Sequence, residues 1–194
     1  MRKIFFYLTV LSGVIFVFSC SETEKESVQK SNEVADKAQA SIEERRKKGD
    51  TLALSPEVLS KALPESVSSY KKEGLIQKTE DKTVGMNWSS VSQNYSDGEK
   101  TILLVISDYN GAYGLYAGAT AIFNSGISIQ TEDELSKPFM SNGKVSGWES
   151  FDKETGAASL MLGKHDRFLI TIQSVGQENM STLYEFANLI NLEF

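Results

Sequence analysis

The chain holds one histidine, and its neighbours are the first candidates for chemistry. His165 stands in the segment GKHDR, directly before Asp166 and Arg167. An imidazole oriented by a carboxylate can act as a general base, which is the arrangement that a hydrolase would use. Adjacent residues of a tight turn rarely converge on one substrate, however, and the sequence has no GxSxG nucleophile motif. We therefore expect His165 to be an exposed turn residue, and we predict no catalytic residue.

Acidic side chains offer two further chemistries, metal binding and acid–base hydrolysis. Asp108 and Asn110 in SDYNG, and the acidic run 132–134, lack the spacing of a calcium loop. One histidine and one cysteine leave too few ligands for an ordinary zinc site. No pattern brings Asp108 and Glu149 together as the carboxylate pair of a glycosidase. The glycine-rich segment 110–118 matches neither GxGxxG nor GxxxxGK, so no metal, nucleotide or other cofactor is predicted.

The cysteine stands where an apolar run ends. Arg2 and Lys3 precede an uncharged stretch over residues 4–18, which is shorter than the roughly 20 residues of a bilayer-spanning helix. A basic start, a short apolar run and a small residue at its end are typical of a secretory signal peptide. The boundary, residues 17–20, reads VFSC. This motif resembles the lipobox of bacterial lipoproteins.

The resemblance implies that residues 1–19 are removed and that the Cys20 thiol carries acyl chains. Two or three chains anchor a protein firmly, because each buried CH₂ contributes about 0.8 kcal/mol. The mature chain then keeps no free thiol for a disulfide or a nucleophile. We expect a protein of the bacterial cell envelope, lipid-anchored to a membrane, with the outer membrane favoured. Its domain would lie in the periplasm or at the cell surface.

Residues 20–50 are expected to form a charged, partly helical tether. The segment has no aromatic residue after Cys20 and few large aliphatic ones, so it buries too little apolar area to fold alone. Pairs at i,i+4 spacing, such as Glu43 with Lys47, favour helix. The basic run 45–48 is expected to be solvated, and the alternative is a patch for anionic headgroups or a partner.

The charge of the mature chain limits its partners. Loss of Arg2 and Lys3 lowers the 20 basic residues to 18 against 26 acidic ones, so the net charge becomes −8. This balance argues against a nucleic-acid partner and against electrostatic binding to an anionic membrane.

Residues 51–194 are expected to form a single α+β domain. Apolar alternation and turn signals predict five strands, at 84–95, 101–109, 144–151, 157–163 and 167–175. The last three are expected to form an antiparallel meander. The predicted fold is an antiparallel sheet of about five to seven strands with two helices, at 111–124 and 180–192, packed on one face. A short helix is also predicted to open the domain after Ser55.

The segment 111–124 carries no charge and more apolar faces than one sheet can cover. Gly111, Gly114 and Gly118 form a smooth stripe, which we expect to lie close to the sheet. An aromatic stripe is the candidate interaction surface, and core packing is the alternative for each of its rings. It consists of Tyr109, Tyr113, Tyr116 and Phe123.

Together these features predict a membrane-anchored envelope lipoprotein that acts as a non-enzymatic binding or interaction module. Its partners would be the membrane, through the lipid, and an envelope protein or other ligand. One alternative is an envelope hydrolase that uses carboxylates or His165, and it requires a pocket with converging polar groups. The other is a carrier of a small apolar ligand, which requires a cavity between helices and sheet.

Overall fold

The computed structural model describes residues 39–84 and 86–193. Cys20, the predicted signal peptide 1–19 and the first part of the predicted tether lie outside these residues. The first described element is a helix over residues 39–47. None of the helices in the described ranges has the length and hydropathy of a membrane span.

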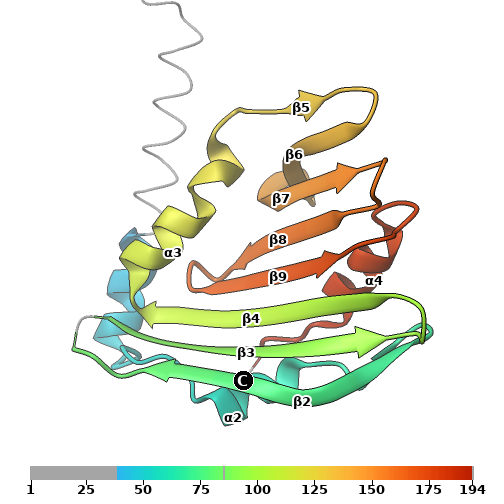
Figure 1. Ribbon diagram of the computed structural model, residues 1–194. Coiled ribbons are helices and arrows are strands. Elements are labelled where there is room, and N and C mark those ends of the chain that lie inside the picture. Colours follow the sequence, from blue (N-terminus) through green and yellow to red (C-terminus); the bar gives the residue numbers. More distant parts are fainter. Residues whose placement is uncertain (1–38, 85, 194) are drawn as a thin grey trace, which may run out of the picture.

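A single antiparallel sheet dominates the fold, and its strands follow the order β1-β2-β3-β4-β9-β8-β7-β6-β5 (Figure 1). The strands are β1 Ser66–Val67, β2 Tyr70–Asp81, β3 Asn87–Ser96, β4 Thr101–Gly111, β5 Ile129–Gln130, β6 Glu134–Ser141, β7 Lys144–Asp152, β8 Ala158–Lys164 and β9 Phe168–Ser174. β4 and β9 lie side by side although more than fifty residues separate them in the chain, so the central pairing joins two consecutive meanders.

The prediction of five to seven strands is wrong, because the sheet has nine. The five predicted strands are present as β3, β4, β7, β8 and β9, and the last three form the predicted meander. Sequence reasoning missed β2, whose residues YKKEGLIQKTED are mostly exposed and charged because it lies near an edge of the sheet. It also missed β6, where Pro138 interrupts the strand signal.

The prediction of two helices on one face is wrong as well. α4 (Ser181–Leu189) packs on one face of the sheet, together with α2 (Pro56–Leu59) and η1 (Ser60–Ala62). α3 (Tyr113–Thr120) and η2 (Ala121–Asn124) lie on the opposite face. We call the first the covered face and the second the open face. Successive side chains of β9 point to opposite faces of the sheet. Ile170 belongs to the core under α4, and Leu169 belongs to a smaller cluster under η2.

The main core lies between the covered face and α4. Tyr95 and Phe186 are completely buried there, and their rings meet edge to face with centroids 5.0 Å apart. Each fully buried side chain of this size contributes about 1.5–3 kcal/mol to stability. The open face has a smaller apolar cluster, built from Phe123 of η2, Trp148 and Leu169. Because α3 and η2 occupy one end of that face, the strands at its other end keep an uncovered surface.

Candidate functional site

The open face is the candidate binding site, because strands in register align their side chains in rows across it. One row crosses the sheet from β6 to β2 and is almost entirely polar. It consists of Ser136, Ser150, Ser159, Gln173, Leu103, Asn94 and Glu73. The adjacent row is more apolar in its middle. It consists of Pro138, Trp148, Met161, Thr171, Val105, Ser92 and Gln77.

A hollow of about 630 Å³ lies over this polar row, near the first residues of β4 and β8. Leu103 of β4, Gln173 of β9 and Ser159 of β8 contribute to its lining, with Asp152 of β7 and Glu134 of β6 at one side. Apolar atoms make up most of the exposed lining. An apolar base with a few polar groups is the usual composition of a ligand site.

Several polar side chains of the hollow are free to bind a ligand. Within the described part of the chain, the side chains of Thr101, Ser150, Ser159 and Gln173 form no hydrogen bond with another residue. They stand on paired strands, so their backbone positions are fixed. Groups of this kind can exchange water for ligand without first breaking an internal contact.

The charge of the hollow is negative. Glu134 and Asp152 lie opposite each other on β6 and β7 at one side, and the lining includes no lysine, arginine or histidine. The backbone N–H and hydroxyl of Thr155 donate to Asp152 Oδ1 at 2.8 and 3.0 Å. These bonds lower the pKa of the Asp152 carboxyl, and an ordinary aspartate is already ionised at neutral pH. The hollow consequently disfavours anionic ligands.

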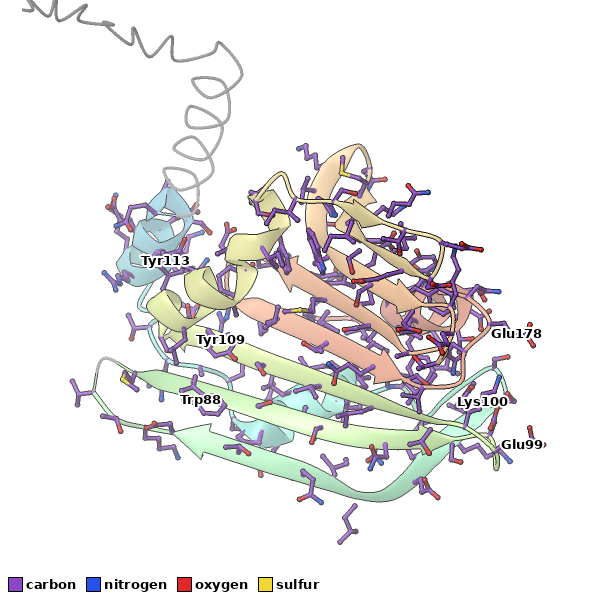
Figure 2. The ribbon with its side chains drawn as sticks, turned by 45° about the horizontal axis from the view of Figure 1, so that its top comes forward. Trp88, Glu99, Lys100, Tyr109, Tyr113 and Glu178 are labelled. Carbon is purple, nitrogen blue, oxygen red and sulfur yellow. The ribbon has the colours of Figure 1, made fainter. Side chains whose placement is uncertain are left out.

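The four residues of the predicted aromatic surface do not form one exposed stripe. Tyr109 is half-buried and stacks on Trp88, with ring centroids 6.0 Å apart. Tyr113 is also half-buried, whereas Tyr116 and Phe123 are buried beneath α3 and η2. Figure 2 shows Trp88, Tyr109 and Tyr113 near the end of the sheet that is remote from Glu99 and Lys100. Only the half-buried rings remain available to a partner.

Gly163 explains how Tyr116 becomes buried. A Cβ atom at this position would lie 2.6 Å from the Tyr116 hydroxyl oxygen and 3.3 Å from a ring carbon of Phe123. The bare backbone of β8 therefore gives both rings room against the sheet. Burial raises the pKa of Tyr116 well above its ordinary value.

Asp108 is part of a buried ion cluster instead of a catalytic pair. Its carboxylate accepts two hydrogen bonds from Arg167, from Nε at 2.9 Å and from Nη2 at 2.5 Å. The backbone N–H groups of Leu54 and Asn110 donate to the same carboxylate, and Arg167 Nη1 reaches Asp50 Oδ2 at 2.8 Å. Asp108 is thus fully engaged, and the arrangement is structural.

The second carboxylate of the proposed hydrolytic pair is distant from the first. Glu149 Oε2 accepts a hydrogen bond from the Tyr184 hydroxyl at 2.6 Å, and Glu149 Oε1 lies 3.3 Å from Lys137 Nζ. β9 and β8 stand between β4, which carries Asp108, and β7, which carries Glu149. At about 4.8 Å per strand the two are separated by at least ~14 Å, beyond the ~9.5 Å limit of glycosidase pairs.

His165 lies in the turn between β8 and β9, as predicted. It is exposed, and both it and Asp166 have positive φ, 56° and 50°. Its ring meets Phe168 edge to face, and among the described residues its ring nitrogens bond no carboxylate. This geometry does not support the hypothesis that His165 acts as the general base of a hydrolase.

One cavity beside α4 is smaller than the hollow of the open face. A cavity of about 180 Å³ is lined by Phe139, Leu162 and Tyr184, among others, and it borders Ser146. The buried Ser146 hydroxyl has no partner among the described residues. Sites for drug-sized ligands occupy about 300–1,000 Å³, so the geometry favours the open face over an internal carrier cavity.

The end of the predicted tether contacts the domain. Arg45 donates from Nε to Asn110 Oδ1 at 2.9 Å and from Nη1 to the carbonyl oxygen of His165 at 3.0 Å. Ile42 is buried, although its segment looked too polar to fold. Helix 39–47 is therefore fixed beside the point where β4 leads into α3.

No family model and no curated protein matches this sequence.

Proposed function

We propose that this protein is a membrane-anchored lipoprotein of the bacterial envelope that acts as a non-enzymatic binding module. Its binding site is the open face of the sheet. The observation that carries the proposal is the hollow of about 630 Å³ on that face, with side chains from five strands around it. The lipid anchor on Cys20 is supported by the VFSC motif and the uncharged run before it.

The chemistry of the hollow favours a neutral ligand that is rich in hydroxyl or amide groups. Ser159, Gln173 and Thr101 offer hydrogen bonds, and Leu103 offers an apolar contact. Glu134 and Asp152 make phosphate-bearing and sulfate-bearing ligands unfavourable, because the lining has no cation to balance them. Neither the Asp108–Glu149 pair nor His165 of the hydrolase alternative lines this hollow, and the described cavity beside α4 is smaller, at about 180 Å³.

Site-specific photo-crosslinking in the native envelope tests this proposal. A benzoylphenylalanine at Gln173 places the reactive group in the hollow, and one at Leu189 places it on the exposed side of α4. We expect covalent adducts with envelope material from Gln173 and none from Leu189.

A charge-and-size variant sharpens the result. Ser159→Arg should suppress the Gln173 adducts, because it fills the hollow, whereas Asn188→Arg on the covered side should leave them unchanged. Equal adducts from Gln173 and Leu189, or adducts that survive Ser159→Arg, would exclude the open face as the binding site.

A further inference from the structure

α3 presents a second apolar surface that points away from the sheet. Residues 109–131 include no charged residue, in a chain of which 24% is charged. Ala112, Tyr116 and Phe123 turn toward the sheet and are buried. The opposite side of α3 and η2 is exposed. We call this exposed side, with the turn that follows, the α3 patch; it consists of Gly114, Leu115, Gly118, Ile122 and Ile127.

Gly114 and Gly118 lie in this patch, so the expectation that the glycine stripe approaches the sheet is wrong for these two residues. Gly111 does lie against β3, where a Cβ atom would come within 2.6 Å of the Asn87 Cβ atom. A Cβ atom at Gly114 or Gly118 would have no heavy atom within 4 Å outside its own helix. The large side chains of the patch are exposed as well, at 46% for Leu115, 39% for Ile122 and 51% for Ile127. A contiguous, uncharged apolar surface of this kind is typical of an interaction site.

The tether reaches the domain beside this patch. Arg45 bonds Asn110, three residues before α3 begins. Figure 1 shows the blue helix 39–47 next to α3. Eighteen residues, 21–38, lead from residue 39 back to Cys20. The membrane anchor therefore connects to the molecule at the α3 end.

We propose that the α3 patch contacts the lipid bilayer in which Cys20 is anchored, an inference that depends on the proposed anchor. Tethering keeps the patch at a high local concentration of lipid, so a modest apolar surface is sufficient for contact. The patch has no charge and the mature chain is acidic, so the contact is apolar and insensitive to salt. This distinguishes it from the basic run 45–48, whose attraction to anionic headgroups would be screened.

The contact also orients the hollow. β4 runs from Thr101, in the lining of the hollow, to Gly111, directly before α3. Eleven residues of strand span about 33 Å. A bilayer at the α3 patch leaves the hollow exposed to the aqueous phase.

The test uses the full lipidated chain in vesicles of phosphatidylcholine mixed with anionic phosphatidylglycerol, with one added cysteine carrying a nitrobenzoxadiazole dye. Ile122→Cys reports on the patch, and Val175→Cys, exposed at the hollow end, is the matched control. The acylated Cys20 does not react with the dye. We expect lipids with doxyl-labelled chains to quench the dye at position 122 several-fold more than at 175, at low and high salt alike.

Three results would overturn the proposal. Equal quenching at positions 122 and 175 in vesicles that carry the protein shows that the patch does not contact lipid. Quenching that disappears at high salt assigns the contact to the basic run 45–48. The dye at position 122 could also lose its contact with water in the absence of lipid, to an extent that rises with protein concentration. This result assigns the patch to a second copy of the chain.

Flotation of the vesicles separates this inference from the anchor itself. Protein that floats without quenching at position 122 contradicts the α3 patch alone, whereas protein that fails to float contradicts the anchor and the patch together. A dye at Ile127→Cys provides a second readout. Its quenching should fall several-fold when Leu115 and Ile122 are both replaced by serine. Both side chains are exposed, so the double replacement removes apolar surface from the patch and leaves the core unchanged.

Discussion

Asp108 and Arg167 form the most deeply buried ion pair of the described chain. Their polar atoms are already bonded within the protein, so we assign them a structural role and no role in binding or catalysis. Arg167 binds both oxygens of Asp108, and the backbone of Leu54 supplies a further donor. Removing one partner of such a pair leaves an uncompensated charge, which is more costly than the pair itself is stabilising.

We predict that Asp108→Ala lowers the free energy of unfolding by about 3–5 kcal/mol, because Arg167 then loses its buried counter-ion. Urea denaturation followed by circular dichroism measures this change. Glu185→Ala, on the exposed side of α4, is the control and should change stability by less than about 0.5 kcal/mol. A similar small effect for both variants would contradict the structural role of the cluster.

Because Tyr95 is buried, we predict that the free energy of unfolding falls in alkaline solution. Its side chain is fully buried, its hydroxyl donates to the carbonyl oxygen of Pro64 at 2.8 Å, and burial raises its pKa above the ordinary value. The unfolded chain releases this proton near pH ~10, whereas the folded chain retains it. The stabilising contribution is therefore complete below about pH 10 and is lost above it, by about 1.4 kcal/mol per pH unit.

Tyr95→Phe should reduce the slope of stability against pH above about pH 10 by this one-proton amount. Guanidinium unfolding at a series of pH values measures the slope. Tyr116 and Tyr184, whose pKa values are raised as well, leave a residual slope in the variant. An unchanged slope would show that Tyr95 ionises equally in both states.

At the scale of elements, α3 differs most from its predicted placement. The sequence shows that 111–124 is uncharged and apolar on several faces, but it does not show which face meets the sheet. That choice depends on Gly163 of β8, which admits Tyr116 and Phe123, and the partner strand lies about forty residues further along the chain. Leu115 and Ile122 are left exposed as a consequence.

We predict that Gly114→Ala and Gly118→Ala each stabilise the protein by about 0.5–1 kcal/mol. Both sites are helical and open, so alanine reduces the entropy of the unfolded chain without a clash. Gly147→Ala in β7 is the contrasting variant, since its Cβ would lie 2.0 Å from the carbonyl oxygen of Met161, and it should destabilise the protein. Thermal unfolding distinguishes the two outcomes, and a loss of stability in Gly114→Ala would contradict the exposed position of the stripe.

The strands show what sequence reasoning can and cannot reach. β3, β4 and the meander β7–β9 carry apolar alternation that marks them directly. β2, which lies beside the short edge strand β1, has little, because most of its side chains are exposed. Pro138 conceals β6, the neighbour of the edge strand β5. Charged residues and proline at such edges also discourage pairing with other chains.

The hollow illustrates a second limit. The predicted meander already contains three residues of the polar row, Ser150, Ser159 and Gln173. Their alignment across neighbouring strands could therefore have been predicted from the sequence. Leu103 joins them only because β4 pairs with β9, and no local pattern predicts that distant pairing. The polar alternation of Ser90, Ser92 and Asn94 was the available signal that one face of the sheet is solvated.

At the scale of the whole molecule, the two surfaces lie at opposite ends of β4. The α3 patch adjoins the helix through which the tether enters, and the hollow lies near Thr101. The proposed bilayer contact and the proposed ligand site therefore do not overlap. Asp50 bonds Arg167 and Arg45 bonds Asn110, so the chain between helix 39–47 and the domain contacts the sheet at the α3 end.

The lipid on Cys20 is the claim on which this arrangement depends, and intact-mass spectrometry of the protein purified from its native membranes tests it most directly. We predict a chain that begins at Cys20 and carries the added mass of two or three acyl groups, with a fragment spectrum that places them on this residue. A chain that still begins at Met1, or one with an unmodified thiol at position 20, would contradict the account.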